Sequence, residues 1–104
     1  MPYQEMLLGA YGAVTCEQPF CYASQYQQLP QRLQRQFDKA LGFLLVDLRY
    51  PSLRAKKMEG QRDPEGRDIW EARISRSHRF TFAIDGDLYI LYRIGPHAIE
   101  RHPV

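Results

Sequence analysis

The sequence is poor in the residues that most often bind metals or cross-link a small protein. Cys16 and Cys21 are its only cysteines among 104 residues, and no histidine cluster accompanies them, so we expect free thiols with no metal site and no cofactor. No apolar run approaches the roughly 18 residues of a membrane-spanning helix. No basic leader precedes the apolar residues near the N-terminus, which disfavours a signal peptide. We therefore expect a cytoplasmic protein without a membrane partner.

Charge is nearly balanced over the whole chain but unevenly distributed along it. The formal net charge is only +2. Residues 1–48 carry three cations against four acids, whereas residues 49–104 carry eleven cations against eight acids and all three histidines. The basic character therefore lies in the second half, which favours a nucleic acid or an acidic protein as partner.

The first half of the chain predicts helices. Residues 1–12 have two glycines and no period, so we expect a loosely ordered N-terminal segment there, followed by a short strand over residues 13–17. Prolines at positions 19, 30 and 51 delimit two helical patterns, and residues 19–48 predict a helical hairpin. Apolar residues recur at helical spacing in the second pattern, at Leu33, Phe37, Ala40, Leu41, Leu44 and Leu45.

After Pro51 the apolar period changes from helical to two, which predicts strands. Strands are expected over residues 53–58, 68–76, 78–84 and 88–94, with a charged loop over 60–67 and an Asp-Gly turn at residues 85–86. The 104 residues fit one domain. The predicted fold is α+β, with a small antiparallel β-sheet of about four strands, within residues 53–94, packed against the N-terminal helical hairpin.

The strand over residues 68–76 alternates apolar and charged side chains. Successive strand residues point to opposite faces, so Trp70 and Ile74 are expected in the core and Glu71 and Arg73 on the other face. A sheet with one apolar and one cationic face indicates a surface that holds an anion.

Five motifs in order carry a resemblance to a known family. They are Pro-Ser-Leu-Arg-x-Lys-Lys at 51–57, Ile-Trp-Glu-Ala-Arg-Ile-Ser at 69–75, Ser-His-Arg-Phe-Thr-Phe at 77–82, Asp-Gly-Asp at 85–87 and Ile-Gly-Pro-His at 94–97. With this order and spacing, about residues 20–98 resemble the RelE/ParE superfamily of type II toxin–antitoxin toxins. The resemblance implies a single RelE-like toxin domain over residues 1–104. RelE-like members cleave mRNA, usually in the ribosomal A site, by driving the ribose 2′-hydroxyl onto the adjacent phosphate.

The resemblance implies roles for three residues, and the chain itself offers a fourth candidate. Such a reaction needs no metal if the protein supplies a base, cations for the phosphate and an acid for the departing oxygen. Arg79 matches the arginine that contacts the scissile phosphate, and His97 matches the general acid. Arg73 is expected to face Arg79 across a strand pair as a second cation. Glu71 is a candidate base, although flanking cations are expected to lower its pKa.

Further residues are candidates for holding the RNA. Lys56 and Lys57 point to opposite faces of a regular strand, so only Lys56 is expected to line the site. Tyrosines on the last strand offer a ring for stacking a base. The remaining expected RNA contacts are Arg54, Arg76, Tyr89 and Arg93.

One departure from the family pattern leaves alternatives open. Several RelE-like enzymes place a tyrosine just beyond the final motif, and here Ala-Ile-Glu-Arg follows at 98–101. A ParE-like inhibitor of DNA gyrase and a catalytically inactive antitoxin-binding regulatory partner are the alternatives to an mRNA endoribonuclease. The expected partners are a cognate antitoxin in a hetero-oligomer, mRNA and the ribosome.

Overall fold

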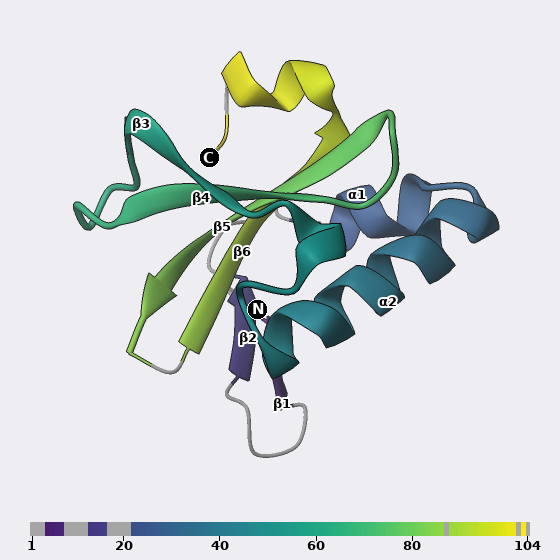
Figure 1. Cartoon of the computed structure of the whole chain (residues 1–104), viewed down its shortest axis with the longest axis horizontal. Coiled ribbons are helices and arrows are strands. Elements are labelled where there is room, and N and C mark those ends of the chain that lie inside the picture. Colours follow the sequence, from purple (N-terminus) through teal and green to yellow (C-terminus); the bar gives the residue numbers. More distant parts are fainter. Residues whose placement is uncertain (1–3, 8–12, 17–21, 87, 102, 104) are drawn as a thin grey trace.

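A computed structural model describes residues 4–7, 13–16, 22–86, 88–101 and 103 (Figure 1). Six strands, two α-helices and two short 3-10 helices are formed within these residues. In chain order they are β1 (Gln4–Leu7), β2 (Ala13–Cys16), α1 (Tyr22–Gln28), α2 (Gln31–Val46), η1 (Pro51–Leu53), β3 (Lys56–Arg62), β4 (Asp68–Arg73), β5 (His78–Asp85), β6 (Leu88–Pro96) and η2 (His97–Arg101).

All six strands form one sheet in the order β1-β2-β6-β5-β4-β3. Strands β3 to β6 pair antiparallel in chain order, which confirms the predicted antiparallel sheet and the α+β class. β2 adds to the free edge of β6 in parallel, and β1 pairs antiparallel with β2. The expectation of a loosely ordered segment over residues 1–12 is wrong for residues 4–7. Backbone pairing along an edge needs no alternating side chains, so the sequence pattern did not reveal this strand.

The two α-helices follow the proline pattern. Pro30 separates them with φ −54° and ψ 147°, and Asp47 ends α2 in extended geometry. The pair packs together because Tyr26 donates to Asp38 Oδ2 at 3.0 Å and its ring meets Phe37 edge-on. This arrangement fits the predicted hairpin over the described part of its range; residues 17–21 lie outside the described residues. Among the described residues, no helix is long and apolar enough to cross a membrane.

The main core lies between α2 and one face of the sheet (Figure 1). The six apolar residues predicted for this helix are all buried. Phe37 meets Phe80 edge-on with ring centroids 5.3 Å apart, and Phe80 in turn packs against Phe82. Trp70 and Ile74 are partly buried at the margin of the same cluster, on the face predicted for them.

Several strand bounds differ from the prediction. Pro51–Leu53 forms η1, and β3 begins only at Lys56 because Arg54, in the left-handed region at φ 46°, interrupts the extended chain. β3 then continues to Arg62, through residues expected in a loop. β4 ends at Arg73, since the amide of Ile74 already donates to the carbonyl of His78 in a tight turn.

The second face of the sheet is not simply cationic, contrary to the prediction. Ile69, Ala83, Ile90 and Tyr92 form a second buried cluster there. Next to it the Tyr92 hydroxyl donates to Asp63 Oδ2 at 2.7 Å. 

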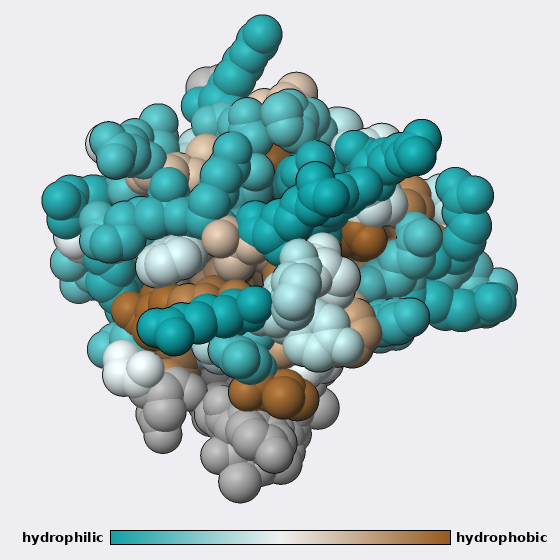
Figure 2. All heavy atoms as spheres, in the orientation of Figure 1, coloured by the Kyte–Doolittle hydropathy of each residue, from teal (hydrophilic) through white to brown (hydrophobic). Residues whose placement is uncertain are grey.

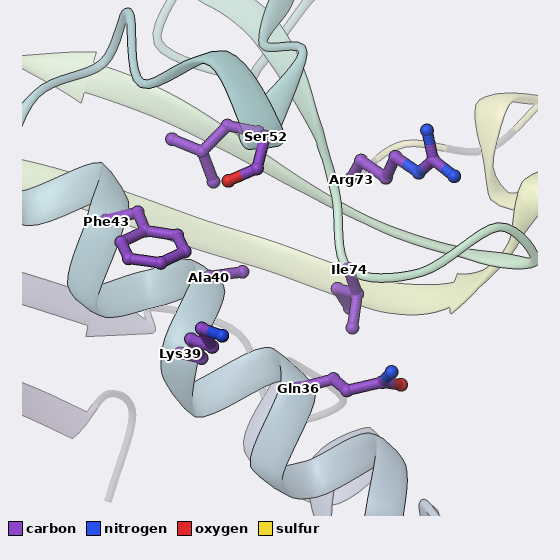
Figure 3. Close-up of a pocket in the computed structure, with 8 residues that line it drawn as sticks. Gln36, Lys39, Ala40, Phe43, Ser52, Arg73 and Ile74 are labelled. Carbon is purple, nitrogen blue, oxygen red and sulfur yellow. The ribbon is translucent and has the colours of Figure 1, made fainter.

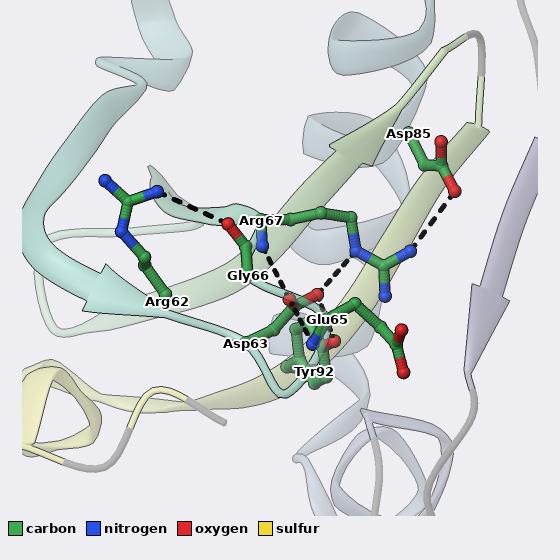
Figure 4. A network of polar contacts seen from close by, with 7 residues as sticks. All are labelled: Arg62, Asp63, Glu65, Gly66, Arg67, Asp85 and Tyr92. Atoms are coloured by element: carbon green, nitrogen blue, oxygen red, sulfur yellow. Dashed lines mark hydrogen bonds and ion pairs between the residues drawn. The ribbon is translucent and has the colours of Figure 1, made fainter.

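The same Asp63 carboxylate organises the β3–β4 turn (Figure 4). Its Oδ2 accepts from Arg67 Nε at 2.6 Å, and its Oδ1 accepts from the amides of Glu65 and Arg67. Burial tends to raise the pKa of Asp63, but the hydrogen bonds from Tyr92 and Arg67 outweigh it, and the net shift is downward. Arg67 also reaches Asp85 at 3.2 Å, which joins this turn to the end of β5.

Candidate functional site

The sheet register places most of the predicted site residues in two adjacent rows. On the face opposite α2, one row runs across four strands through Lys56, Glu71, Thr81 and Arg93. The next row runs through Arg73, Arg79 and Gly95. Arg73 and Arg79 are direct register partners, as the sequence predicted.

The C-terminal 3-10 helix η2 packs against this face because Gly95 has no side chain. A Cβ at Gly95 would lie 2.6 Å from Cγ2 of Ile99, which is closer than carbon atoms can approach. Pro103 is held against the sheet as well, since Thr81 Oγ1 donates to its buried carbonyl at 2.6 Å. These contacts bring His97 and Glu100 over the two rows.

We call Glu71, His97 and Glu100, together with Lys56 and Arg79, the acid–base cluster. One carboxylate oxygen of Glu71, one of Glu100 and one ring nitrogen of His97 all lie within 4.8 Å of one another. His97 Nε2 is 3.1 Å from Glu100 Oε1. On the other side of the cluster, Glu71 Oε1 is 3.8 Å from Lys56 Nζ and 3.9 Å from Arg79 Nε.

Glu71 is the most buried member of this cluster, with a side chain only 4% exposed. Its Oε2 is buried and accepts no hydrogen bond from a described residue, and Oε1 of Glu100, also buried, has only the His97 Nε2 contact at 3.1 Å. Two carboxylates in such surroundings repel each other unless they share a proton. Burial first, and then the neighbouring Glu100, raise the pKa of Glu71 to about 7 against the opposing effect of Lys56 and Arg79.

Lys56 and Arg79 do lower the pKa of Glu71, as expected for flanking cations, but the net shift is upward. Burial and Glu100 outweigh the two cations, because neither cation is closer than 3.8 Å. The pKa of Glu100 moves the other way and is lowered, first by its hydrogen bond from Glu71 and then by the charges of His97, Lys56 and Arg79. When the two groups share one proton, Glu71 therefore carries it and donates the hydrogen bond, and Glu100 is the ionised carboxylate that accepts it.

Arg79 is held in place by the β4–β5 turn. Its Nη1 donates to the carbonyl oxygens of Ser75 at 2.6 Å, His78 at 2.9 Å and Arg76 at 3.3 Å. The side chain is 17% exposed, and its Nη2 has no partner among the described residues. The guanidinium is therefore fixed in orientation with one donor group left for a ligand.

Glu71, His97 and Glu100 are also the one group among the described residues whose atoms are close enough to coordinate a single ion. Two carboxylates and an imidazole suit a first-row transition metal. However, Lys56 and Arg79 already place two positive charges beside Glu71, and they would repel a dication. This charge balance fits proton transfer better than metal binding.

Arg54, Arg73 and Arg76 lie at the edge of the sheet beside η1 rather than within the cluster. They line a cavity of 660 Å³ together with Gln36, Pro51, Ser52, Ile74 and Ser75. A smaller cavity of 220 Å³ shares four of these residues and extends toward Lys39 and Phe43 of α2 (Figure 3). In Figure 3 the Arg73 side chain extends away from Phe43 and Ala40 of α2.

Tyr89 and Arg93, the other residues expected to hold RNA, are not members of the acid–base cluster. Tyr89 is partly buried and packs edge-on against Phe82 on the α2 side of the sheet, so the structure does not bring it to the cluster where it was expected to stack an RNA base. Arg93 lies in the row of Glu71, half-buried, and its Nε has no hydrogen-bond partner. Lys57 points away from Lys56, as predicted, and pairs with Asp68 at 3.4 Å.

Comparison of the chain with protein-family models, with curated proteins and with solved structures finds no match.

Glu100 is the site residue that the sequence interpretation missed. It lies in residues 98–101, a segment considered only for the tyrosine it lacks. The signal was the spacing of His97 and Glu100, which at i, i+3 lie on the same side of a helical turn. The burial of Glu71 against Glu100 has no signal in the sequence.

Proposed function

We propose that this protein is a RelE-like endoribonuclease, the toxin of a toxin–antitoxin system, which cleaves mRNA by attack of the 2′-hydroxyl on the adjacent phosphate. The observation that carries the proposal is the acid–base cluster. A carboxyl group with a pKa of about 7, an imidazole and two cations meet on one face of the sheet. The sequence resemblance adds the substrate class to this chemistry.

In the proposed reaction, the Glu71 carboxylate accepts the proton of the ribose 2′-hydroxyl. The 2′-oxygen forms a bond to phosphorus, the bond to the 5′-oxygen breaks, and the leaving oxygen takes a proton from His97. The products are a 2′,3′-cyclic phosphate and a free 5′-hydroxyl. A base is most effective when its pKa is near the working pH, and the raised pKa of Glu71 meets this condition at neutral pH.

Arg79 and Lys56 would stabilise the negative charge that builds up on the phosphate. The Nη1 contacts with the turn carbonyls fix the Arg79 guanidinium before substrate binds. Such preorganised charge lowers a barrier more than a mobile side chain can, because no reorganisation is needed during the reaction. Arg73, the register partner of Arg79, adds a second guanidinium on the neighbouring strand.

The proposal includes the partners that the resemblance implies, a cognate antitoxin and the translating ribosome in the cytoplasm. The support from the chain is the excess of cations over acids in residues 49–104. Hydrophilic side chains dominate the face of the molecule in Figure 2, with smaller hydrophobic patches between them. An acidic antitoxin segment that covers Lys56 and Arg79 would neutralise the site.

The decisive experiment expresses the chain alone and maps mRNA 5′ ends. We expect growth arrest with new 5′-hydroxyl ends, and the loss of both in an Arg79→Ala/His97→Ala variant. Removing a general acid alone typically slows such a reaction by 10²- to 10⁴-fold. The matched control, Arg49→Ala/His78→Ala, removes the same residue types outside the cluster and should remain toxic.

Two results would contradict the assignment. Arrest without new mRNA ends would exclude cleavage, and full toxicity of the Arg79→Ala/His97→Ala variant would exclude these residues. A change of plasmid supercoiling in the arrested cells would instead support the ParE-like gyrase inhibitor. Harmless expression of the unaltered chain would support the inactive regulatory partner.

A further inference from the structure

Three arginines around one cavity have no polar partner in the part of the chain that the structure describes. The side chains of Arg54, Arg73 and Arg76 make no hydrogen bond or ion pair with any described residue, whereas Lys56, Lys57, Arg62, Arg67 and Arg79 all pair with acids. The eight residues that line the 660 Å³ cavity include no acid. We call this cavity the arginine groove.

The groove concentrates positive charge that the protein itself does not neutralise. Arg54 and Arg76 are exposed and Arg73 is half-buried. Repulsion among three guanidinium groups at one cavity is relieved by an anion between them. The planar guanidinium pairs with two oxygens of a phosphate group, and Gln36, Ser52 and Ser75 add neutral hydrogen-bonding groups along the same wall.

The local backbone presents these arginines outward. Arg54 has φ 46°, a left-handed conformation that a residue with a side chain adopts at some energetic cost, directly after the 3-10 helix η1. Arg76 lies in the β4–β5 turn, and its carbonyl accepts from Arg79. The turn that fixes Arg79 in the acid–base cluster therefore also places Arg76 on the groove.

We propose that the arginine groove binds the phosphodiester backbone of single-stranded RNA next to the scissile bond. This inference rests on the proposed function, because the groove is continuous with the cluster through Arg73, the register partner of Arg79. A strand whose scissile phosphate lies at Arg79 would pass Arg73 and place neighbouring phosphates at Arg54 and Arg76. Single-stranded RNA fits the proposed attack, since the 2′-hydroxyl must leave helical geometry to align with the phosphate.

The test measures binding to a fluorescent 2′-O-methyl RNA oligonucleotide by anisotropy at several salt concentrations. The probe cannot be cleaved, so binding is observed independently of catalysis. The Arg54→Gln/Arg76→Gln variant removes two proposed phosphate contacts. For single strands each contact adds about 0.7 to the slope of log affinity against log salt, so the slope should fall by about 1.4.

This slope change has a direct consequence for affinity. Between 50 and 200 mM salt, the unaltered protein should lose about 7-fold more affinity than the variant does. At 50 mM salt the variant should bind at least about 10-fold more weakly. The control variant Arg49→Gln/Arg62→Gln has the same change of charge outside the groove and should keep the original slope. Circular dichroism should show the same thermal transition for both variants, since all four arginines are exposed.

Three results would overturn the inference. The first is an unchanged slope and affinity in Arg54→Gln/Arg76→Gln, and the second is an equal loss in the control variant. The third is unchanged RNA binding together with lost binding of a labelled polyglutamate peptide, which would assign the groove to an acidic protein. The proposed function fails separately: if the unaltered chain cuts no mRNA but the variant loses RNA binding, the groove stands and the nuclease does not.

Discussion

Replacing Glu100 by glutamine tests the pairing at the centre of the acid–base cluster. The substitution keeps the size of the side chain and removes its charge next to Glu71. Glu71 then loses the neighbour that raises its pKa and keeps Lys56 and Arg79, which lower it. We therefore expect Glu100→Gln to shift the pKa of Glu71 downward from about 7.

The size of the shift follows from the geometry. The two carboxylates lie within 4.8 Å of each other, and two unit charges at that separation repel by about 3.5 kcal/mol at an effective dielectric constant of 20, or about 2.5 pKa units. The Glu100 side chain is 30% exposed, so water screens part of this repulsion. A shift of about one unit is the expected result, and the burial of Glu71 keeps its pKa above that of an exposed glutamate.

The measurement is a carbon-13 NMR titration of the glutamate carboxyl groups, with Glu71 assigned by its loss in Glu71→Gln. It reports the protonation of Glu71 without requiring activity. In a cleavage assay the same change should move the rise of rate with pH to lower pH, because the base must be ionised. The control Glu65→Gln removes an exposed carboxylate in the β3–β4 turn and should leave both curves unchanged.

A Glu71 signal that titrates at the same pH in Glu100→Gln as in the unaltered protein would refute this reasoning. Burial alone would then account for the raised pKa, and Glu100 would not share a proton with Glu71. A shift upward would be equally damaging, since it would mean that Glu100 stabilises the ionised form of its neighbour.

Two further predictions concern the support of the site. Gly95→Ala should displace η2 and lower the rate of cleavage by at least 10-fold, because the added Cβ meets Ile99. A second substitution, Ile99→Ala, should restore part of the activity. No loss of activity in Gly95→Ala would contradict the packing argument. Tyr92→Phe should destabilise the fold by about 1.5–3 kcal/mol in urea denaturation, since Asp63 loses a buried donor at 2.7 Å, and an unchanged midpoint would contradict this assignment.

The fold could be predicted where side-chain periodicity decides it. The spacing of Leu33, Phe37, Leu41 and Leu44 defines the buried face of α2, and alternation defines β4 and β5. β1 could not be predicted, because edge pairing depends on backbone hydrogen bonds that any residue type can make. The ends of β3 and β4 were misplaced for a similar reason, since the left-handed φ of Arg54 leaves no periodic signal.

The positions of the cations in the site could be predicted from the sequence, but the raised pKa of Glu71 could not. Register follows from alternation and a short turn, so Arg73 opposite Arg79 could be derived from the sequence. The raised pKa of Glu71 depends on how closely η2 approaches the sheet. That distance is set by Gly95 and by the hydrogen bond from Thr81 to Pro103. Neither contact follows from the periodicity of the sequence.

The buried carboxyl of Glu71 is difficult to explain by stability alone. A folded-state pKa raised from 4.5 to about 7 makes its stabilising contribution fully present below the unfolded pKa and lost as the pH rises through about 7. That difference amounts to about 3 kcal/mol, partly offset by the lowered pKa of Glu100. A glutamine would fill the same space without this loss, and the same face already has a stable apolar cluster at Ile69 and Ile90. A carboxyl group at such a position, beside His97 and Arg79, suits proton transfer better than packing.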